Sequence, residues 1–236
     1  MNSKISMILC TYNEEHYIDE TINKLFKNLS NVELIIVDDN SIDKTREIIN
    51  NNKNNDKITL IHRKKTRGLA SAFATALLKC NADKIGWLDT NMSELTYEFN
   101  NLNKVVDDGA DIALLSRYVK GGADNRKLLR SITSKIYNFI CRILLNPNVK
   151  DYTSGIFMMK RNVLNEVTFI SYGHGDFFVE FIENSIRKGF IIKEIPYTQK
   201  KDENLDLSKT DSSIFKFFYL GFKYIIRIIF ILIRRN

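Results

Sequence analysis

The sequence predicts an α/β fold in which a mostly parallel sheet is flanked by helices. Short apolar runs of strand length alternate with amphipathic stretches of helix length through the first half of the chain. The 236 residues include only two prolines, Pro147 and Pro196, so these elements are largely uninterrupted. Strands that alternate with helices of this length form right-handed βαβ units, and such units build a parallel sheet.

The expected elements follow one another along the chain. The strands of the first half are short apolar runs: Ile5–Cys10, Glu33–Val37, Ile58–His62, Lys84–Leu88 and Asp111–Leu115. The helices between them are amphipathic: Glu15–Leu29, Asp43–Asn52, Leu69–Cys80 and Leu95–Asp107. The last third adds a helix, a strand and a polar loop: Asp176–Lys188, Phe190–Ile195 and Thr198–Thr210.

Composition and charge narrow the possible partners and compartment. The 44% hydrophobic content is enough to build a core, and 35 basic against 28 acidic residues leave a formal charge of +7. This excess favours anionic partners, such as nucleotides, phosphorylated lipids, membrane surfaces or nucleic acid, although a generic basic surface would explain it too. Three scattered cysteines indicate free thiols, and the first apolar run is too short for a signal peptide, so we expect a cytoplasmic protein.

Polar residues gather directly after the expected strands. In a parallel sheet, ligands bind beyond the carboxyl ends of the strands, so these residues should meet along one edge. One such cluster is usually only a turn or a helix cap, but four along one edge indicate a ligand site. The four clusters are Thr11–Glu14, Asp38–Ser41, Asp89 with Asn91, and Ser116 with Arg117.

Acidic residues at strand ends suit a nucleotide-sugar site. One carboxylate can accept hydrogen bonds from the base or the ribose. A second, with a neighbouring oxygen ligand, can hold a divalent metal ion against the diphosphate, where the charge of the leaving group develops. Asp38 and Asp39 after one strand, and Asp89 and Asn91 after another, match this division.

These motifs resemble those of family 2 glycosyltransferases, which have the GT-A (Rossmann-like) fold, and within them the dolichyl- or polyprenyl-phosphate sugar synthases. The resemblance runs from Ile5 to about Lys209, although Cys10 stands where proline is usual. It covers Thr11–Glu14, Val37–Thr45, and Arg63 with Gly68–Ala70 and Ala72. It implies that the nucleotide-sugar donor is contacted by Tyr12, Glu14, Asp39 and Asp43.

The segment Asp89–Ser93 stands where this family has an Asp-x-Asp metal motif followed by a polar ligand. The resemblance therefore implies that Asp89, Asn91 and Ser93 bind Mg²⁺ or Mn²⁺, with Asp89 also serving catalysis and the donor. Asn91 can offer a carbonyl oxygen but no negative charge, so metal affinity should be lower than with aspartate. A degenerate, inactive site is the alternative.

The acceptor side is indicated by Ser116–Gly122 and by the helix that follows. Arg130, Ser134 and Asn138 lie at four-residue steps, which places them on one helix face. Guanidinium and hydroxyl groups together bind phosphate well. Although such a face alone is more often a solvated surface, the resemblance implies that Arg117, Arg130 and Ser134 hold an acceptor phosphate and act as catalytic residues.

The polar loop near the end of the chain departs from the family. The family carries an arginine, a glycine and Ser-Lys there, whereas this chain keeps Ser208 and Lys209, has Lys200 or Lys201 in place of the arginine, and lacks the glycine. Lysine retains the charge but not the bidentate geometry of arginine. The resemblance implies that Lys201 and Lys209 contact the donor diphosphate.

The last 25 residues are strongly apolar but contain regularly spaced basic residues. Lys216, Lys223, Arg227 and Arg234 fall close to one line on a helix, which is typical of a helix lying in a membrane interface. These charges argue against a simple transmembrane span. We therefore expect a catalytic domain over residues 1–210 and a membrane-interface helix over 211–236; packing on the protein's own domain, or in a homo-oligomer, is the alternative.

The leading interpretation is inverting transfer of a hexose from a GDP- or UDP-sugar to a polyprenyl phosphate, dolichyl or undecaprenyl, at the cytoplasmic face of a membrane. One alternative is a family 2 transferase that uses another acceptor in surface glycan synthesis. Another is a catalytically impaired nucleotide-sugar-binding protein. Nucleic-acid binding would explain the charge but not the acidic strand ends, so no nucleic-acid partner is expected. The three histidines are dispersed and form no recognisable triad.

Overall fold

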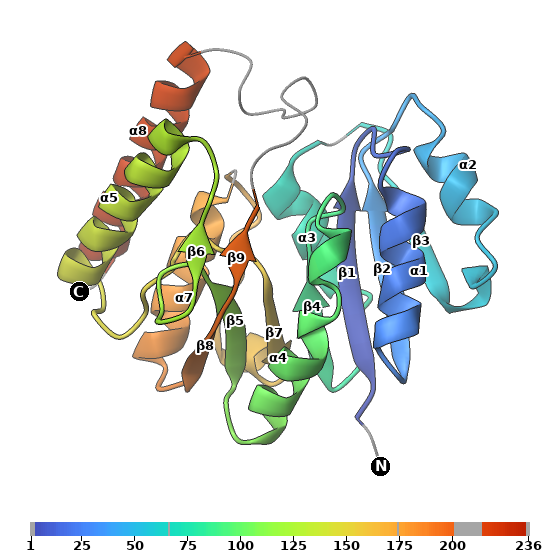
Figure 1. Ribbon diagram of the computed structural model, residues 1–236, viewed down its shortest axis with the longest axis horizontal. Helices are drawn as coiled ribbons and strands as arrows, with labels where there is room; N and C mark the ends of the chain where they lie inside the picture. Colours follow the sequence, from blue (N-terminus) through green and yellow to red (C-terminus); the bar gives the residue numbers. More distant parts are fainter. Residues whose placement is uncertain (1–2, 66, 174, 201–213, 235–236) are drawn as a thin grey trace.

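The computed structural model describes residues 3–65, 67–173, 175–200 and 214–234, and the side chains of 214–220 are not described. Its centre is a seven-stranded sheet in the order β3-β2-β1-β4-β7-β5-β8 (Figure 1). The strands are β1 (Ile5–Thr11), β2 (Val32–Asp38), β3 (Ile58–His62), β4 (Lys84–Trp87), β5 (Ile112–Ser116), β7 (Phe157–Lys160) and β8 (Ile192–Pro196). A second, two-stranded sheet pairs β6 (Ala123–Asp124) with β9 (Thr198–Gln199).

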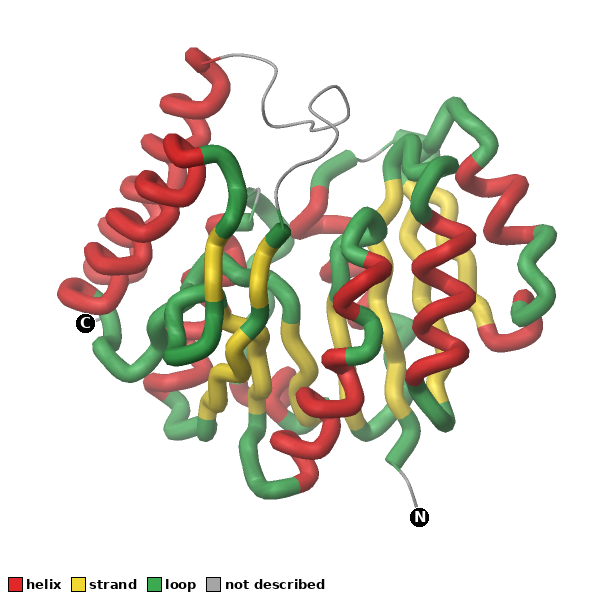
Figure 2. The backbone as a smooth tube through the Cα atoms, in the orientation of Figure 1, coloured by secondary structure: helices red, strands yellow, loops and turns green. Residues whose placement is uncertain are grey.

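Helices cover both faces of the large sheet, as the tube drawing in Figure 2 shows. The α-helices are α1 (Ile18–Asn28), α2 (Thr45–Asn50), α3 (Leu69–Leu77), α4 (Glu98–Asp107), α5 (Leu128–Leu144), α6 (Val163–Glu166), α7 (Asp176–Arg187) and α8 (Ile214–Ile233). Two short 3₁₀ turns are η1 (Asn55–Lys57) and η2 (Ser93–Leu95). The predicted α/β architecture with a mostly parallel sheet is therefore confirmed.

One strand of the large sheet, β7, runs against the others. It lies between β4 and β5 and pairs antiparallel with both, while the remaining pairings are parallel. The sequence pattern did not predict it, because a four-residue apolar run with no helix-length partner carries little periodicity. Its position separates the end of β5 from the ends of β4, β1 and β2.

The core consists of two apolar layers, one on each face of the sheet. Neighbouring residues of β1 alternate between them: Met7 and Leu9 belong to the layer beneath α1 and α4, and Ile8 to the layer beneath α3, α5, α7 and α8. In the second layer the ring of Trp87 stacks on Phe177 of α7, with ring centroids 5.5 Å apart. The first turn of α7 is thereby packed against the end of β4.

The C-terminal helix α8 packs against α5 and α7, and its Ile228 and Ile231 are buried (Figure 1). Arg227 is buried as well and forms salt bridges with two carboxylates of α7, whereas Lys223 is exposed. At Arg227 the basic stripe faces the domain, as in the alternative of packing on the protein's own domain, and the membrane-interface position of the helix stays a prediction. The side chain of Lys216 lies outside the described residues, and the division of the chain at 210/211 stays a prediction.

The outer face of α8 remains apolar and exposed. Its exposed large apolar side chains are Phe222, Ile225, Ile229, Phe230 and Ile233, and Lys223 is exposed as well. Among the helices that the structure describes, none combines the length and apolarity needed to cross a bilayer.

Candidate active site

The loops after β1, β2 and β4 lie side by side at the upper edge of the sheet in Figure 1, because these strands are neighbours. This adjacency agrees with the clusters expected from the sequence at these three strand ends. The loop after β5 lies beyond the intervening strand β7. The edge therefore divides into one region at β2, β1 and β4, and another at β5 and α5.

The loops after β1 and β2 are held together by hydrogen bonds. The amide of Asn13 donates to the Ser41 hydroxyl at 2.9 Å, and the Asn13 side-chain oxygen accepts from the amide of Ile42 at 3.0 Å. The amide of Glu14 donates to the Thr45 hydroxyl at 2.8 Å. Asn13 has a φ of 56°, a left-handed conformation that asparagine tolerates better than most residues. The two loops thus form one rigid shelf.

Asp43 holds this shelf to the start of α2. Its carboxylate accepts the hydroxyl and amide protons of Thr45, at 2.6 and 3.0 Å, and the amide proton of Glu15 at 3.2 Å. Burial raises the pKa of Asp43, but these hydrogen bonds outweigh it and hold the pKa below its ordinary value. The structure thus gives Asp43 a supporting contact, and its predicted contact with the donor stays a prediction.

Asp38 is also a supporting residue. It is fully buried, and its carboxylate accepts hydrogen bonds from the Ser41 hydroxyl, from the Ser41 amide at 3.0 Å and from the Thr11 hydroxyl at 3.1 Å. These bonds shape the turn that presents the next residue, Asp39.

Asp39 directly follows the last residue of β2, and it is 7% exposed. One carboxylate oxygen accepts from Arg63 Nε at 2.7 Å and lies 2.6 Å from Arg63 Nη2, and the other accepts from the amide of Gly68 at 2.8 Å. Arg63 in turn donates to the Ser71 hydroxyl at 3.0 Å. A carboxylate has about four acceptor positions, so Asp39 keeps capacity for a base or ribose while its orientation is fixed.

Tyr12 carries a cation above its ring. The guanidinium carbon of Arg67 lies 4.5 Å from the ring centroid, and Nη1 donates to the Tyr12 hydroxyl at 3.1 Å. An aromatic ring with a planar guanidinium offers a flat surface suited to a nucleobase. Arg67 was not among the residues expected from the sequence, since nothing in its spacing marks it.

Asp89 and Asn91 are both exposed on the turn after β4. This turn is fixed from beneath: the Thr21 hydroxyl of α1 donates to the Thr90 carbonyl at 2.6 Å, and the Thr90 hydroxyl donates to the Cys10 carbonyl at 3.4 Å. The two side chains that could reach a metal ion are thus presented to solvent on a supported turn.

The oxygen ligands available on this turn fit Mg²⁺ or Mn²⁺, which prefer oxygen. Within the described ranges no group of three or more histidine, cysteine or acidic side chains could hold a metal ion. Ser93 accepts a hydrogen bond from Lys24 Nζ at 3.3 Å, a contact that places a cation beside its hydroxyl. The chain would thus supply few ligands, and phosphate or water would supply the others.

Cys10, in β1, lies within electrostatic reach of Asp39 after β2 and of Asp89 after β4. Burial first, and then the charges of Asp89 and Asp39, raise the pKa of its thiol well above the ordinary value, against the opposing charge of Arg63. The thiol therefore stays protonated and is suited neither to nucleophilic attack nor to metal binding.

Arg117, after β5, is buried and engaged. Its Nε and Nη2 donate to the two carboxylate oxygens of Asp151 at 2.8 and 2.7 Å, and Nη2 also donates to the Thr153 hydroxyl at 2.7 Å. The guanidinium is 3.9 Å from the carboxylate of Asp124. Arg117 thus orders the loop at 151–153, and direct contact with an acceptor phosphate stays a prediction.

Ser134 lies beside this network on α5. Its hydroxyl accepts from the Tyr118 hydroxyl at 2.8 Å and lies 3.4 Å from the Thr153 hydroxyl. Asn138, one turn later, donates to Thr153 at 2.9 Å. Arg130 lies one turn before Ser134 on α5 and is half-buried. The structure therefore places Ser134 next to the Arg117 network, with Arg130 on the same helix. Lys201 and Lys209 lie outside the described residues.

Comparison with known proteins identifies the family of the chain. The family model "Glycosyl transferase family 2" matches residues 6–168, which is more than half of the chain. Dolichol-phosphate mannosyltransferase of Pyrococcus furiosus is 30% identical over 200 residues, covering 83% of this chain but only 56% of its own length. Polyprenol monophosphomannose synthase of Mycolicibacterium smegmatis is 28% identical over 215 residues, covering 88% of this chain and 81% of its own.

Solved structures share the fold. Glucosyl-3-phosphoglycerate synthase from Mycobacterium tuberculosis, in complex with Mn²⁺, UDP and phosphoglyceric acid, has a TM-score of 0.71 at 15% identity, covering 98% of this chain and 78% of its own. A mannosyltransferase from Pyrobaculum calidifontis, in complex with GDP-Man and Mn²⁺, has a TM-score of 0.59 at 15% identity, covering 84% and 57%. The fold is therefore GT-A-like, and the chain belongs to glycosyl transferase family 2.

Proposed function

We propose that the protein transfers a hexose, with inversion, from a GDP- or UDP-sugar to a polyprenyl phosphate of the dolichyl or undecaprenyl type. The observation that carries this proposal is the pairing of two regions on one sheet edge. A donor region includes Asp39, Tyr12 and Asp89 at neighbouring strand ends, and a second region includes Ser134 and Arg130 on α5, the helix that follows β5 and β6 in the chain. The names of the two related mannosyl transferases support the acceptor class.

In this proposal the chain's residues mainly bind and orient. Asp39, held by Arg63, accepts hydrogen bonds from the base or ribose, and Tyr12 with Arg67 contacts the base. Asp89 and Asn91 would hold Mg²⁺ or Mn²⁺, which would neutralise charge on the diphosphate. An oxygen of the acceptor phosphate attacks the anomeric carbon, and the bond to the nucleoside diphosphate breaks on the opposite face. The phosphate is already ionised, so no strong general base is required.

The acceptor would reach Ser134 and Arg130 from a membrane. Exposed apolar side chains on α5 and α8, two helices that pack side by side, form what we call the apolar face: Leu128, Leu129, Ile132, Ile136, Phe139, Ile143, Phe222, Ile225, Ile229, Phe230 and Ile233. Helices of this kind lie in the plane of a membrane interface. We place the protein peripherally, on the cytoplasmic face.

Radiolabelled sugar transfer tests the reaction. A panel of GDP- and UDP-sugars is offered with a short-chain polyprenyl phosphate in detergent, with Mn²⁺ or with EDTA. We expect a lipid-soluble product from one donor that EDTA abolishes and that Asp89→Asn lowers at least a hundredfold. Asp56→Asn, at an exposed residue far from the site, is the matched control and should leave the rate unchanged.

A nucleotide-sugar-binding protein is the second candidate, and the absence of a second acidic residue at Asn91 favours it. Donor binding without transfer to any polyprenyl phosphate would support this candidate or a different acceptor in surface glycan synthesis. Donor binding without transfer would refute the proposed reaction under either of these interpretations.

A further inference from the structure

A basic pocket lies along α5 and begins beside Ser134, the residue proposed to bind the acceptor, because Tyr118 and Asn138 both line the pocket and contact Ser134. Its volume is about 290 Å³, and it is lined by Tyr118, Lys135, Asn138, Phe139, Arg142 and Lys150. Four of these residues come from one face of α5, because positions three and four apart on a helix are neighbours. Arg142 is twelve residues beyond Arg130, which separates them by about 18 Å along the helix.

Three cationic side chains line the pocket beside apolar surface. These are Lys135, Arg142 and Lys150, and the lining includes no acidic side chain. Across the part of the chain that the structure describes, none of these three side chains forms a salt bridge. The carboxylate of Glu194 accepts a hydrogen bond from the backbone amide of Lys150 at 2.8 Å, which fixes the main chain at that wall. Three unpaired cations around one cavity favour an anion.

The two uncharged polar residues of the lining, Tyr118 and Asn138, use their polar atoms within the protein. The Tyr118 hydroxyl donates to Ser134 at 2.8 Å, and the Asn138 amide donates to Thr153 at 2.9 Å and to the Ser134 carbonyl at 2.8 Å. These polar atoms already have partners inside the protein. Recognition of a ligand therefore rests on the three cations and on the rings of Tyr118 and Phe139.

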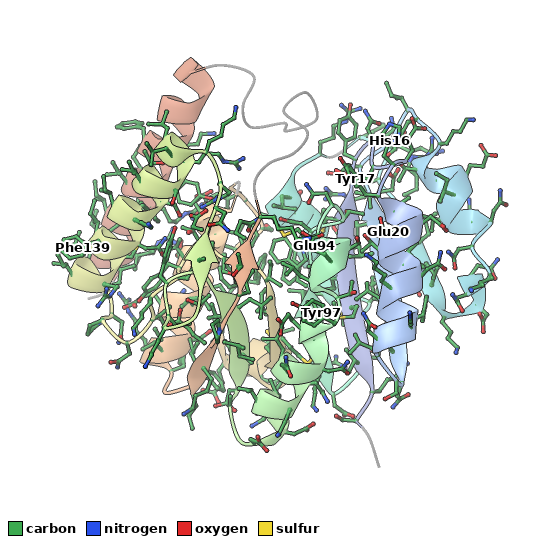
Figure 3. All side chains as sticks on the ribbon, viewed as in Figure 1. His16, Tyr17, Glu20, Glu94, Tyr97 and Phe139 are labelled. Atoms are coloured by element: carbon green, nitrogen blue, oxygen red, sulfur yellow. The ribbon has the colours of Figure 1, made fainter. Side chains whose placement is uncertain are left out.

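The pocket opens beside the apolar face. Phe139 lines the pocket, is 59% exposed and lies on the outer side of α5 (Figure 3). Ile132, Ile136 and Ile143 continue the exposed stripe along the same helix. A ligand that satisfies both features carries a phosphate next to acyl chains, since the cations bind the phosphate and the stripe meets the chains.

We propose that this pocket binds the phosphate headgroup of an anionic membrane phospholipid that is not the sugar acceptor. The inference rests on the membrane docking proposed above and adds a defined lipid site to it. A bound headgroup would fix α5, and with it Ser134, at a set depth and rotation against the bilayer.

Vesicle flotation of the full chain tests this site. Phosphatidylcholine vesicles are made with phosphatidylglycerol or with oleate, matched in zeta potential, so that only one carries an anionic phosphodiester. We expect at least tenfold tighter binding to the phosphatidylglycerol vesicles, which is about 1.4 kcal/mol. The combined Lys135→Gln, Arg142→Gln and Lys150→Gln variant should lose this preference while still floating with both.

A matched control removes three exposed lysines at other places: Lys53→Gln, Lys57→Gln and Lys104→Gln. This control should keep the preference. Equal binding of the unmodified protein to both vesicles, or a preference that survives in the pocket variant, would overturn the proposal. So would tight binding of glycerol phosphate in solution together with no preference between vesicles, since the ligand would then be a free phosphate.

The proposed reaction is separated from this test by sugar transfer to the short-chain acceptor in detergent. Unchanged transfer by the pocket variant, with its lipid preference lost, is the expected result and shows that the variant is folded. If the unmodified protein floats with neither vesicle, membrane docking and the lipid site both fail, whereas transfer in detergent still tests the reaction.

Discussion

Arg227→Met should detach α8 from the body of the protein. The guanidinium is 4% exposed and bridges α8 to α7, with Nε donating to Asp176 at 2.8 Å and Nη1 donating to Glu180 at 2.9 Å. Nη2 donates to the Tyr172 carbonyl at 3.2 Å, and the Tyr172 ring lies 4.7 Å from the guanidinium. Methionine has a similar length and retains the apolar packing of the stem, so the change removes mainly the charge and its hydrogen bonds.

The expected magnitude follows from what the substitution leaves behind. Asp176 and Glu180 are 4% and 2% exposed, and removing one partner of a buried ion pair costs about 3–5 kcal/mol because the other charge stays buried. Glu180 keeps a hydrogen bond from Arg234 at 2.8 Å, although that arginine is half-exposed. We therefore expect a loss near the lower end, about 3 kcal/mol of unfolding free energy.

Urea unfolding followed by tryptophan fluorescence measures this loss. Trp87 is the single tryptophan and stacks on Phe177 of α7, so its emission reports on the helix that receives α8. Lys223→Met, at an exposed residue of α8, is the control and should change stability by less than about 0.5 kcal/mol. Faster amide exchange throughout α8 should accompany the loss in Arg227→Met.

A combined variant separates charge from packing. Adding Asp176→Asn and Glu180→Gln to Arg227→Met should recover much of the stability, because neutral amides cost less to bury than unpaired carboxylates. A loss below about 1 kcal/mol in Arg227→Met would refute the assignment of this ion pair as the attachment of α8. No recovery in the combined variant would show that the loss comes from packing.

Three further predictions concern metal affinity, backbone fit and acid stability. Asn91→Asp adds a negative charge to the exposed turn and should lower the Mn²⁺ concentration for half-maximal nucleotide-dependent metal binding about tenfold by calorimetry; unchanged affinity would contradict a metal site there. Gly122→Ala should lower the unfolding free energy, measured with urea, by about 2 kcal/mol. The reason is that a Cβ at this position would lie 2.5 Å from the backbone carbonyl oxygen of Ser116. An unchanged unfolding free energy would show that this turn shifts freely. Burial raises the pKa of Asp124, but the hydrogen bond and charge of Arg126 outweigh it and hold the pKa well below the unfolded value of about 3.9. The stabilisation is therefore full above about pH 5 and is lost progressively as the pH falls toward the lowered pKa of the folded state. The difference in unfolding free energy between the natural protein and Asp124→Asn should accordingly shrink as the pH falls below about 4; a constant difference would refute this.

Much of the fold followed from local pattern. Each expected strand is a strand in the structure, with bounds that differ by at most two residues, because buried parallel strands are continuous apolar runs. The strand β7 was missed because nothing local distinguishes an antiparallel strand from an apolar turn. The pairing of β6 with β9 was missed for a similar reason, since each has two residues and the two lie far apart in sequence.

The site was predictable in position but less so in detail. Sheet order brought the ends of β1, β2 and β4 together, as expected from polar residues at strand ends. Which residue of a cluster supports the fold and which faces the site depends on contacts with residues that are distant in sequence. Asp38 and Asp39 are adjacent, yet one closes its own turn and the other faces Arg63 and Gly68. Arg117 is buried because Asp151, 34 residues later, receives it.

The helix α8 shows why charge on an apolar helix is ambiguous in sequence. A basic residue on such a helix is typical of a membrane interface, but it is equally compatible with a buried ion pair, and helical periodicity is the same in both cases. The two differ only in whether acidic partners lie opposite, and Asp176 and Glu180 are 51 and 47 residues from Arg227. Periodicity identifies the face that differs from the others, whereas tertiary structure decides whether that face meets lipid or protein. In α8 the charged Arg227 faces protein, and the apolar side chains of the opposite face remain available to a membrane.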